Sequence, residues 1–230
     1  MPKPNNIILE GITGSVAYGL NTETSDIDIK GVYVLPTRKV LEIGFDPKHT
    51  TIDNVDPDWV YHEVGKFMKL VINGNPTVTE LLYLNEYTKM TPIGQMLVDN
   101  RDAFLSTKAV TNAYSGYAFS QAKKLNNRTE QGLNGYDSSL KNRFAKHTRH
   151  CFRLLMQARQ LLETGTLNVK VTPEEREYLF AMGEKTADEV VAEFMRQDTE
   201  MKNVKSILPD EPDYERLNSL LYEIRIKYGV

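Results

Sequence analysis

Two short apolar runs near the start of the chain are each bounded by turn-forming residues. Residues 7–12 are almost entirely apolar and end at a Gly-Ser pair, which is typical of a buried strand that feeds a tight turn. Residues 26–34 begin with alternating polar and apolar positions, which predicts a second strand. In that strand, Asp26 and Asp28 would project from one face.

Later residues carry one more strand signal and then helix signals. Residues 58–61 follow a proline and are rich in β-prone side chains, whereas apolar positions after residue 63 recur at helix spacing. We predict helices over residues 64–72, 92–105, 107–125, 140–162, 173–195 and 214–228, with a polar, glycine-bearing loop over residues 126–139. The expected fold is α/β (α+β): a small mixed twisted sheet with helices on one side, followed by a helical region. We place the catalytic domain at residues 1–105 and the helical domain, which completes the cleft, at residues 106–230.

A turn separates the helix over residues 64–72 from the next helix. Its Gly-Asn-Pro sequence ends one helix and starts another near residue 77. Thr77 and Glu80 have the spacing of a capping box, in which the carboxylate of Glu80 would return to the backbone of Thr77.

The stretch from Gly14 to Asp28 carries the main candidate chemistry. Gly14 lacks a Cβ, so its backbone can approach a ligand closely, and the N–H groups and hydroxyl from Ser15 onward could face a phosphate. Two neighbouring carboxylates, Asp26 and Asp28, repel each other unless a divalent cation lies between them, and such oxygen ligands suit Mg²⁺ or Mn²⁺. An ordinary turn and a solvated edge strand would explain each residue alone but not their combination.

This combination resembles a known family signature. Gly14 and Ser15, followed by Asp26-Ile27-Asp28, are similar to the Gly-[Gly/Ser]…Asp-x-[Asp/Glu] signature of the DNA polymerase β-like nucleotidyltransferase superfamily. Later motifs resemble the RlaP-type predicted nucleotidyltransferases; they lie at residues 66–70, 74–77, 80–82 and 146–155. The whole resemblance spans residues 7–165. The resemblance implies that Gly14, Ser15 and Ser25 contact the triphosphate of an NTP, and that the carboxylates hold the metal.

Members of this superfamily usually have a third carboxylate on a later strand. Asp53, Asp56, Asp58 and Glu63 are the candidates, and we favour Asp58 because it begins the strand with the strongest β-propensity. Glu63 is the second choice, since a glutamate at a helix start more often serves the helix dipole. We interpret the neighbouring His62 as a structural polar residue rather than a base.

A basic helix face is the second candidate feature. Lys146, His150 and Arg153 are spaced four and then three residues apart, so they share one face of the helix over residues 140–162. Spacing alone favours a solvated basic face, whereas the resemblance assigns these residues to neutralising a triphosphate or an RNA backbone. A third interpretation is that the helix supports the sheet through buried ion pairs.

Composition sets the outer limits of the hypothesis. The 230 residues carry a formal net charge of −3, so any nucleic acid would have to be held by a local basic surface. The single cysteine excludes an intramolecular disulfide and a cysteine-rich zinc site. No apolar run approaches the length of a membrane span, and the first residues are too polar for a signal peptide, so we expect a cytoplasmic protein without membrane contacts.

The expected activity is transfer of a nucleoside monophosphate from an NTP to an acceptor hydroxyl, with release of pyrophosphate. Asp26, Asp28 and Asp58 would bind Mg²⁺ or Mn²⁺, and Asp58 would help to deprotonate the acceptor. The resemblance implies an RNA end as the acceptor and a role in RNA repair. A protein side chain and a small molecule are the alternative acceptors that the sequence leaves open. The competing hypothesis is an inactive nucleotide- or RNA-binding sensor on the same fold, which the two retained carboxylates disfavour.

Overall fold

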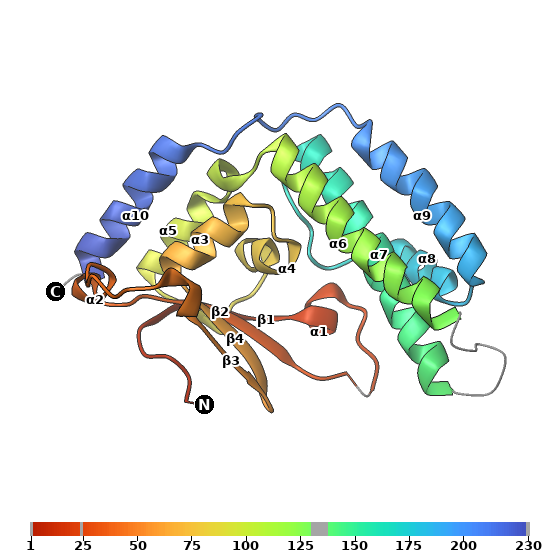
Figure 1. Cartoon of the computed structure of the whole chain (residues 1–230), viewed down its shortest axis with the longest axis horizontal. Helices are drawn as coiled ribbons and strands as arrows, with labels where there is room; N and C mark the ends of the chain where they lie inside the picture. The colour runs from red at the N-terminus through yellow and green to blue at the C-terminus, as the bar shows by residue number, and fades with distance from the viewer. Residues whose placement is uncertain (1, 24, 130–137, 229–230) are drawn as a thin grey trace.

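Five strands form one mixed sheet in the computed structural model, which describes residues 2–23, 25–129 and 138–228 (Figure 1). The spatial order is β3-β4-β2-β1-β5. Strands β2 and β4 are parallel, whereas the other neighbouring pairs are antiparallel. The strands are β1 (Ile7–Thr13), β2 (Asp28–Tyr33), β3 (Thr51–Val55), β4 (Asp58–Glu63) and β5 (Lys89–Met90). The predicted mixed sheet, followed by a helical region, is confirmed.

The second strand starts later than the sequence pattern predicts. Strand β2 begins at Asp28, which pairs with Thr13, the last residue of β1. Beyond Thr13 the chain turns into the short helix α1 (Gly14–Tyr18), so β1 has no residue left to pair with Asp26. The prediction that Asp26 and Asp28 alternate within one strand is therefore wrong, and Asp26 lies in the exposed segment before β2.

Helices make up most of the remaining chain. Short helical turns are α2 (Thr37–Val40), η1 (Pro47–His49), α4 (Pro76–Thr79), η2 (Glu80–Tyr83) and η3 (Arg101–Phe104). The longer helices are α3 (Val64–Ile72), α5 (Pro92–Asp99), α6 (Thr107–Thr129), α7 (Ser138–Thr164), α8 (Pro173–Gly183), α9 (Ala187–Lys202) and α10 (Tyr214–Tyr228). No helix among the described residues is both long and apolar enough to cross a membrane.

Several of these boundaries differ from the sequence prediction, and the helix predicted over residues 92–105 is α5, which ends at Asp99, followed by the turn η3. The single helix predicted over residues 173–195 is two helices, because Thr186 and Glu189 form a capping box that starts α9 after a break. The predicted loop over residues 126–139 begins too early, since α6 continues to Thr129. The remainder of that predicted loop, before α7, lies outside the described residues.

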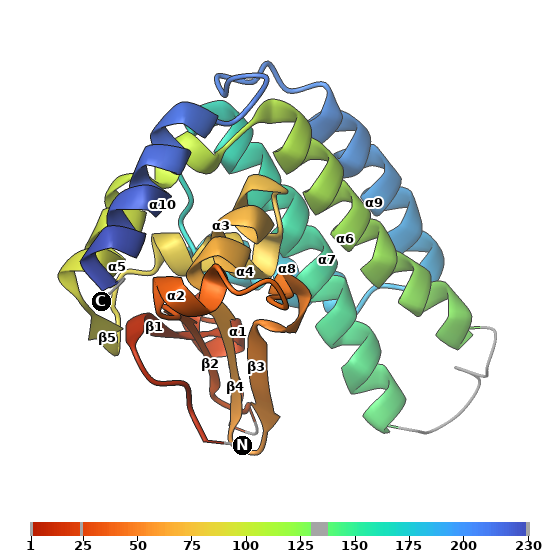
Figure 2. The ribbon, with the colours of Figure 1, turned by 60° about the vertical axis from the view of Figure 1, so that its left-hand side comes forward.

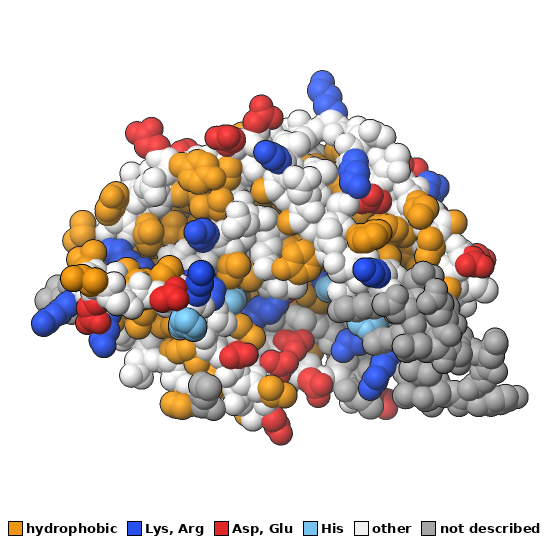
Figure 3. Space-filling model, in the orientation of Figure 1, with side chains coloured by type: hydrophobic (Ala, Val, Ile, Leu, Met, Phe, Trp, Pro, Cys, Tyr) orange, Lys and Arg blue, Asp and Glu red, His pale blue; other side chains and the backbone are white. Residues whose placement is uncertain are grey.

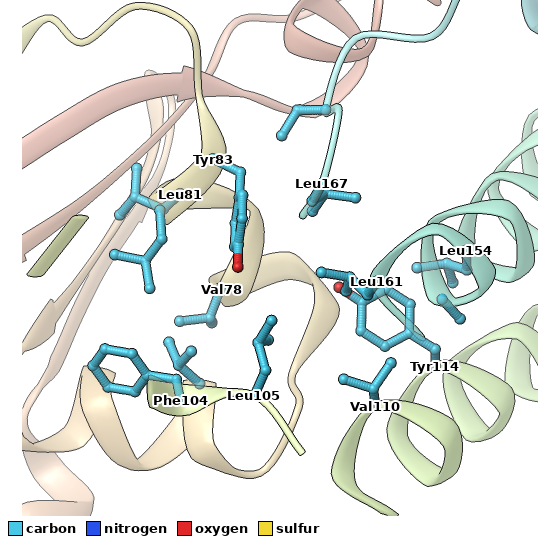
Figure 4. Packing of buried hydrophobic residues seen from close by; sticks show 14 of the residues in the cluster. Val78, Leu81, Tyr83, Phe104, Leu105, Val110, Tyr114, Leu154, Leu161 and Leu167 are labelled. Atoms are coloured by element: carbon cyan, nitrogen blue, oxygen red, sulfur yellow. The ribbon is translucent and has the colours of Figure 1, made fainter. Parts of the chain in front are cut away.

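One continuous hydrophobic core joins the sheet to the helical region. Buried side chains of β2, α3, η2, α6 and α7 belong to the same cluster, among them Val32, Phe67, Leu82, Tyr114 and Phe152. Figure 4 shows the middle of this cluster, where side chains from the turn region of η2 and from α6 and α7 converge. The core therefore crosses the boundary that we placed at residue 105.

The helices cover one face of the sheet, as predicted (Figures 1 and 2). Ile29 pairs with Trp59 in β4, and both contribute to a smaller cluster on the opposite face. Because side chains alternate along a strand, Asp28, Lys30 and Val32 face the helices, and Val32 is indeed part of the main core. Helix α7 packs beside α6 and α8 on this side.

Candidate functional site

Asp28 and Asp58 lie side by side at the start of two neighbouring parallel strands. Each residue comes directly before the pair Ile29 and Trp59, and the two carboxyl groups lie close enough for Asp58 to act on Asp28. Partial burial and the carboxylate of Asp58 raise the pKa of Asp28, whereas the ammonium groups of Lys30 and Lys146 act in the opposite direction. The structure thus brings together two of the three carboxylates that the sequence singled out.

The Gly-Ser turn lies directly against this carboxylate pair. Gly14 has a φ of 65°, and a Cβ added to it would lie 1.7 Å from Oδ2 of Asp28. The turn is short, because α1 has five residues and ends at Gly19 with a φ of 70°. Ser15 is partly exposed within it. The predicted phosphate-binding turn and the predicted metal-binding carboxylate are therefore in contact.

Two other predicted residues lie in the segment before β2 and do not join this contact. Asp26 is exposed, and the described residues contain no group of three His, Cys, Asp or Glu side chains that could hold a metal ion. The hydroxyl of Ser25 accepts a hydrogen bond of 2.8 Å from the backbone N–H of Thr22. Ser25 thus stabilises the local turn of this segment.

The remaining carboxylate candidates have other surroundings. Asp53 is exposed on the outer strand β3, and Asp56 lies in the turn between β3 and β4. Glu63 is buried, accepts a 2.8 Å hydrogen bond from the N–H of Gly65 as the N-cap of α3, and lies 2.6 Å from the guanidinium of Arg225. Its role at the helix start is confirmed.

His62 is held as a structural polar residue, in agreement with its interpretation from sequence. Its Nδ1 lies 2.9 Å from the hydroxyl of Thr51 on the adjacent strand. Burial, together with the nearby charges of Lys66 and Lys30, lowers the pKa of His62 to about 4, so the imidazole is neutral near pH 7.

The three basic residues of α7 differ sharply in exposure. Lys146 is exposed and close enough to Asp28 to influence its carboxylate. Arg153 is only 1% exposed, donates to Gln157 at 2.6 Å, and lies 3.0 Å from Nδ1 of His150. Lys146 therefore faces the site, while Arg153 fits the interpretation in which α7 supports the sheet through buried ion pairs.

Sequence reasoning missed a buried polar cluster beside the site. Glu80 is 1% exposed and accepts hydrogen bonds from Tyr18 at 2.7 Å and from Lys30 at 2.9 Å. The capping box predicted for Thr77 and Glu80 is wrong, because Asn75 is the N-cap of α4 and accepts from the N–H of Thr77. Lys30 could have been noted from the strand alternation, since it shares a face with Asp28, but Glu80 looks like ordinary helix punctuation.

The charges around the site are divided between two parts of the molecule. Figure 3 shows acidic side chains gathered over the strands and basic side chains on the neighbouring helical region. A substrate with several negative charges, held at the carboxylates through a cation, would also be attracted by such a basic surface.

Two comparisons with known proteins bear on this site. A family model described as RlaP, the RNA repair pathway DNA polymerase beta family, matches residues 2–223. An uncharacterised 38.9 kDa protein from the nrdC-mobD intergenic region of Enterobacteria phage T4 is 29% identical over 132 residues. The match covers 51% of this chain and 38% of the phage protein, so the chain spans well under two thirds of that relative.

Proposed function

Because the chain belongs to the RNA repair pathway DNA polymerase beta family, we propose that it is a nucleotidyltransferase that moves a nucleoside monophosphate from an NTP to a hydroxyl group. In this reaction a bond forms between the acceptor oxygen and the α-phosphorus. The bond to the pyrophosphate leaving group breaks, and the hydroxyl proton is released. The description of the family favours an RNA end as the acceptor.

The observation that carries the proposal is the pairing of Asp28 with Asp58. Two carboxylates this close repel each other when both are ionised, and a divalent cation between them removes that repulsion. Carboxylate oxygens are the donors that Mg²⁺ and Mn²⁺ prefer, so the residues present fit such a cation. In the proposal Asp26, which lies in the exposed segment two residues before Asp28, would turn toward this pair as a further ligand when the cation binds. Bound Mg²⁺ or Mn²⁺ would hold phosphate oxygens and stabilise their charge.

The chain's own groups would divide the remaining tasks. Gly14 would let the backbone approach the triphosphate closely, since it carries no side chain beside Asp28, and Ser15 would add its hydroxyl. The exposed ammonium of Lys146 would neutralise phosphate charge. Asp58, the more exposed of the paired carboxylates, would accept the proton of the acceptor hydroxyl.

A labelling experiment tests this proposal. The purified protein is incubated with each α-labelled NTP, Mg²⁺ or Mn²⁺, and total RNA plus protein extract, and the products are resolved on a denaturing gel. Label in RNA, in a protein or in a small molecule identifies the acceptor class, and it should disappear with Asp28→Asn and with Asp26→Asn. No incorporation, together with tight NTP binding that needs no metal, would instead support the nucleotide-binding sensor.

A further inference from the structure

A buried polar cluster joins four elements at the boundary between the sheet and the helical region. We call it the Glu80 cluster; its members are Tyr18 of α1, Lys30 of β2, Glu80 of η2 and Arg153 of α7. The hydroxyl of Tyr18 donates to Oε2 of Glu80 at 2.7 Å, and the ammonium of Lys30 donates to Oε1 at 2.9 Å. Arg153 lies 3.9 Å from the same carboxylate. The cluster therefore connects segments that are far apart in the sequence.

Arg153 holds Tyr18 in two ways. Its guanidinium carbon lies 3.6 Å from the centroid of the Tyr18 ring, and its charge balances the carboxylate that accepts from the Tyr18 hydroxyl. Burial raises the pKa of Tyr18 well above its usual value, so the phenol keeps its proton and donates. Tyr18 is thus fixed on its ring face by α7 and at its hydroxyl by η2.

Stability alone does not account for this arrangement. Glu80 and Arg153 are 1% exposed, whereas the Lys30 side chain is 20% exposed and its ammonium acts on the carboxylates of both Glu80 and Asp28. Burying ionised groups costs several kcal/mol per ion before any pairing, and apolar side chains of similar volume often do as well or better. The buried pair of Glu80 and Arg153, which is also joined to Tyr18 and Lys30, therefore points to a role in fixing geometry.

The cluster meets the candidate site at two points. Tyr18 ends the same five-residue turn that starts at Gly14, which lies against Asp28. Lys30 lies two residues after Asp28 on the same strand face and donates a second hydrogen bond of 2.7 Å to the carbonyl of Thr77. A shift of Tyr18 or Lys30 would consequently move the turn or the strand that form the site.

We propose that Glu80 and Arg153 are positioning residues, which fix the turn Gly14–Tyr18 against the strand of Asp28 through their contacts with Tyr18 and Lys30. The inference rests on the proposed function and deepens it. Reacting groups must be held to within roughly 0.5 Å, so a turn of five residues needs support from outside itself. Arg153 also lies seven residues after Lys146, so anchoring α7 here places the Lys146 ammonium beside the carboxylates.

The test uses the mildest change in the cluster and a matched control. Tyr18→Phe removes only the hydroxyl that donates to Glu80 and leaves the ring under Arg153. Tyr33→Phe removes a similarly buried tyrosine hydroxyl, which donates to the carbonyl of Thr50 away from the cluster. Both variants should melt at similar temperatures.

Two readouts follow the turn itself. Tyr18→Phe should raise the KM for the NTP, and the Kd for the NTP with Ca²⁺ in place of Mg²⁺, by roughly three- to tenfold, the size of effect expected from one ordinary intramolecular hydrogen bond. Amide hydrogen exchange of residues 14–20 should become faster in Tyr18→Phe and stay at the wild-type rate in Tyr33→Phe. A second variant, Glu80→Gln, combined with Tyr18→Phe, should show effects on KM that are less than additive.

The outcomes separate this inference from the proposed function. A wild-type protein that transfers nucleotides, with unchanged KM, Kd and amide exchange in Tyr18→Phe, would overturn the positioning role and leave the proposed function standing. If the wild-type protein transfers nothing, the exchange rates still decide whether the cluster fixes the turn. Equal changes in Tyr18→Phe and Tyr33→Phe would also contradict the proposal, because they would show a general effect of losing a buried hydroxyl.

Discussion

Gly14 lies so close to Asp28 that a Cβ at position 14 would be 1.7 Å from the carboxylate oxygen Oδ2. The contact arises because Thr13 and Asp28 are paired at the end of the β1–β2 ladder, and the chain turns at the next residue with a φ of 65°. The glycine turn and the carboxylate are therefore parts of one structural unit. A change in either residue should affect the other.

The first prediction concerns this contact. Gly14→Ala should displace the Asp28 carboxylate and lower transfer activity at least tenfold, because the added methyl group overlaps it and the positive φ disfavours alanine. Gly116→Ala is the control, since a Cβ at this position meets nothing within 4 Å. Gly116 lies inside α6, where alanine is more favourable than glycine by about 1 kcal/mol. Steady-state kinetics and a thermal melt measure both variants. Wild-type activity in Gly14→Ala would contradict the account.

A second prediction separates Glu63 from the site. Glu63→Ala removes the N-cap of α3 and the partner of Arg225, and it should lower the free energy of unfolding by about 3 kcal/mol. At a temperature where the variant is folded, nucleotide transfer should stay within about twofold of wild type. Urea denaturation and an activity assay at low temperature test this. Loss of activity in a folded Glu63→Ala protein would show that Glu63, rather than Asp58, is the catalytic carboxylate on the later strand.

The third prediction concerns the basic face of α7. Lys146→Ala should raise the KM for the NTP several-fold at low salt and leave the melting temperature unchanged, because this side chain is exposed and acts by its charge. Lys141→Ala is the control, since that lysine is exposed on the same helix and pairs with Glu184. An equal rise of KM in both variants would indicate a general charge effect instead of a specific contact.

The fourth prediction is a pH dependence of stability that arises from His62. Its pKa is lowered from 6.5 to about 4 in the folded protein, so the unfolded chain takes up this proton first as the pH falls below about 6.5. The free energy of unfolding should therefore decrease by about 2 kcal/mol between pH 7.5 and pH 5 through this group. His62→Gln, whose amide can still bond to the Thr51 hydroxyl, should lose that part of the pH dependence. Urea denaturation at both pH values measures this change in the free energy of unfolding. The same change in His62→Gln as in wild type would exclude His62 as its source.

Local patterns were sufficient to predict the strands β1, β2 and β4, the turn and the position of Asp58, but not the strands β3 and β5. Strand propensity after Pro57 marks the start of β4, and parallel pairing with β2 then brings Asp58 beside Asp28. The same patterns could not show where pairing stops. Asp26 continues the alternation of β2, but its place outside the strand is determined by β1, which ends at Thr13.

Long-range contacts explain what the sequence could not predict. Glu80 and Arg153 are 73 positions apart, and each looks locally like part of a helix pattern. Their contact arises only when α7 packs across η2 and α1 in the shared core. Spacing along α7 places Arg153 and Lys146 on one face of the helix. It does not show that Lys146 is exposed while Arg153, two turns later, is buried in the core.

The central claim is that the paired carboxylates Asp28 and Asp58 support nucleotidyl transfer. The most direct test compares the rate of pyrophosphate release from an NTP in wild type, Asp58→Asn and Asp53→Asn. Each reaction contains Mg²⁺ and the acceptor that the labelling experiment identifies. Asp53 is an exposed carboxylate on the strand next to Asp58, so it is the matched control. The account predicts at least a hundredfold loss in Asp58→Asn with an unchanged melt, and wild-type rates in Asp53→Asn. Wild-type pyrophosphate release in a folded Asp58→Asn protein would contradict it.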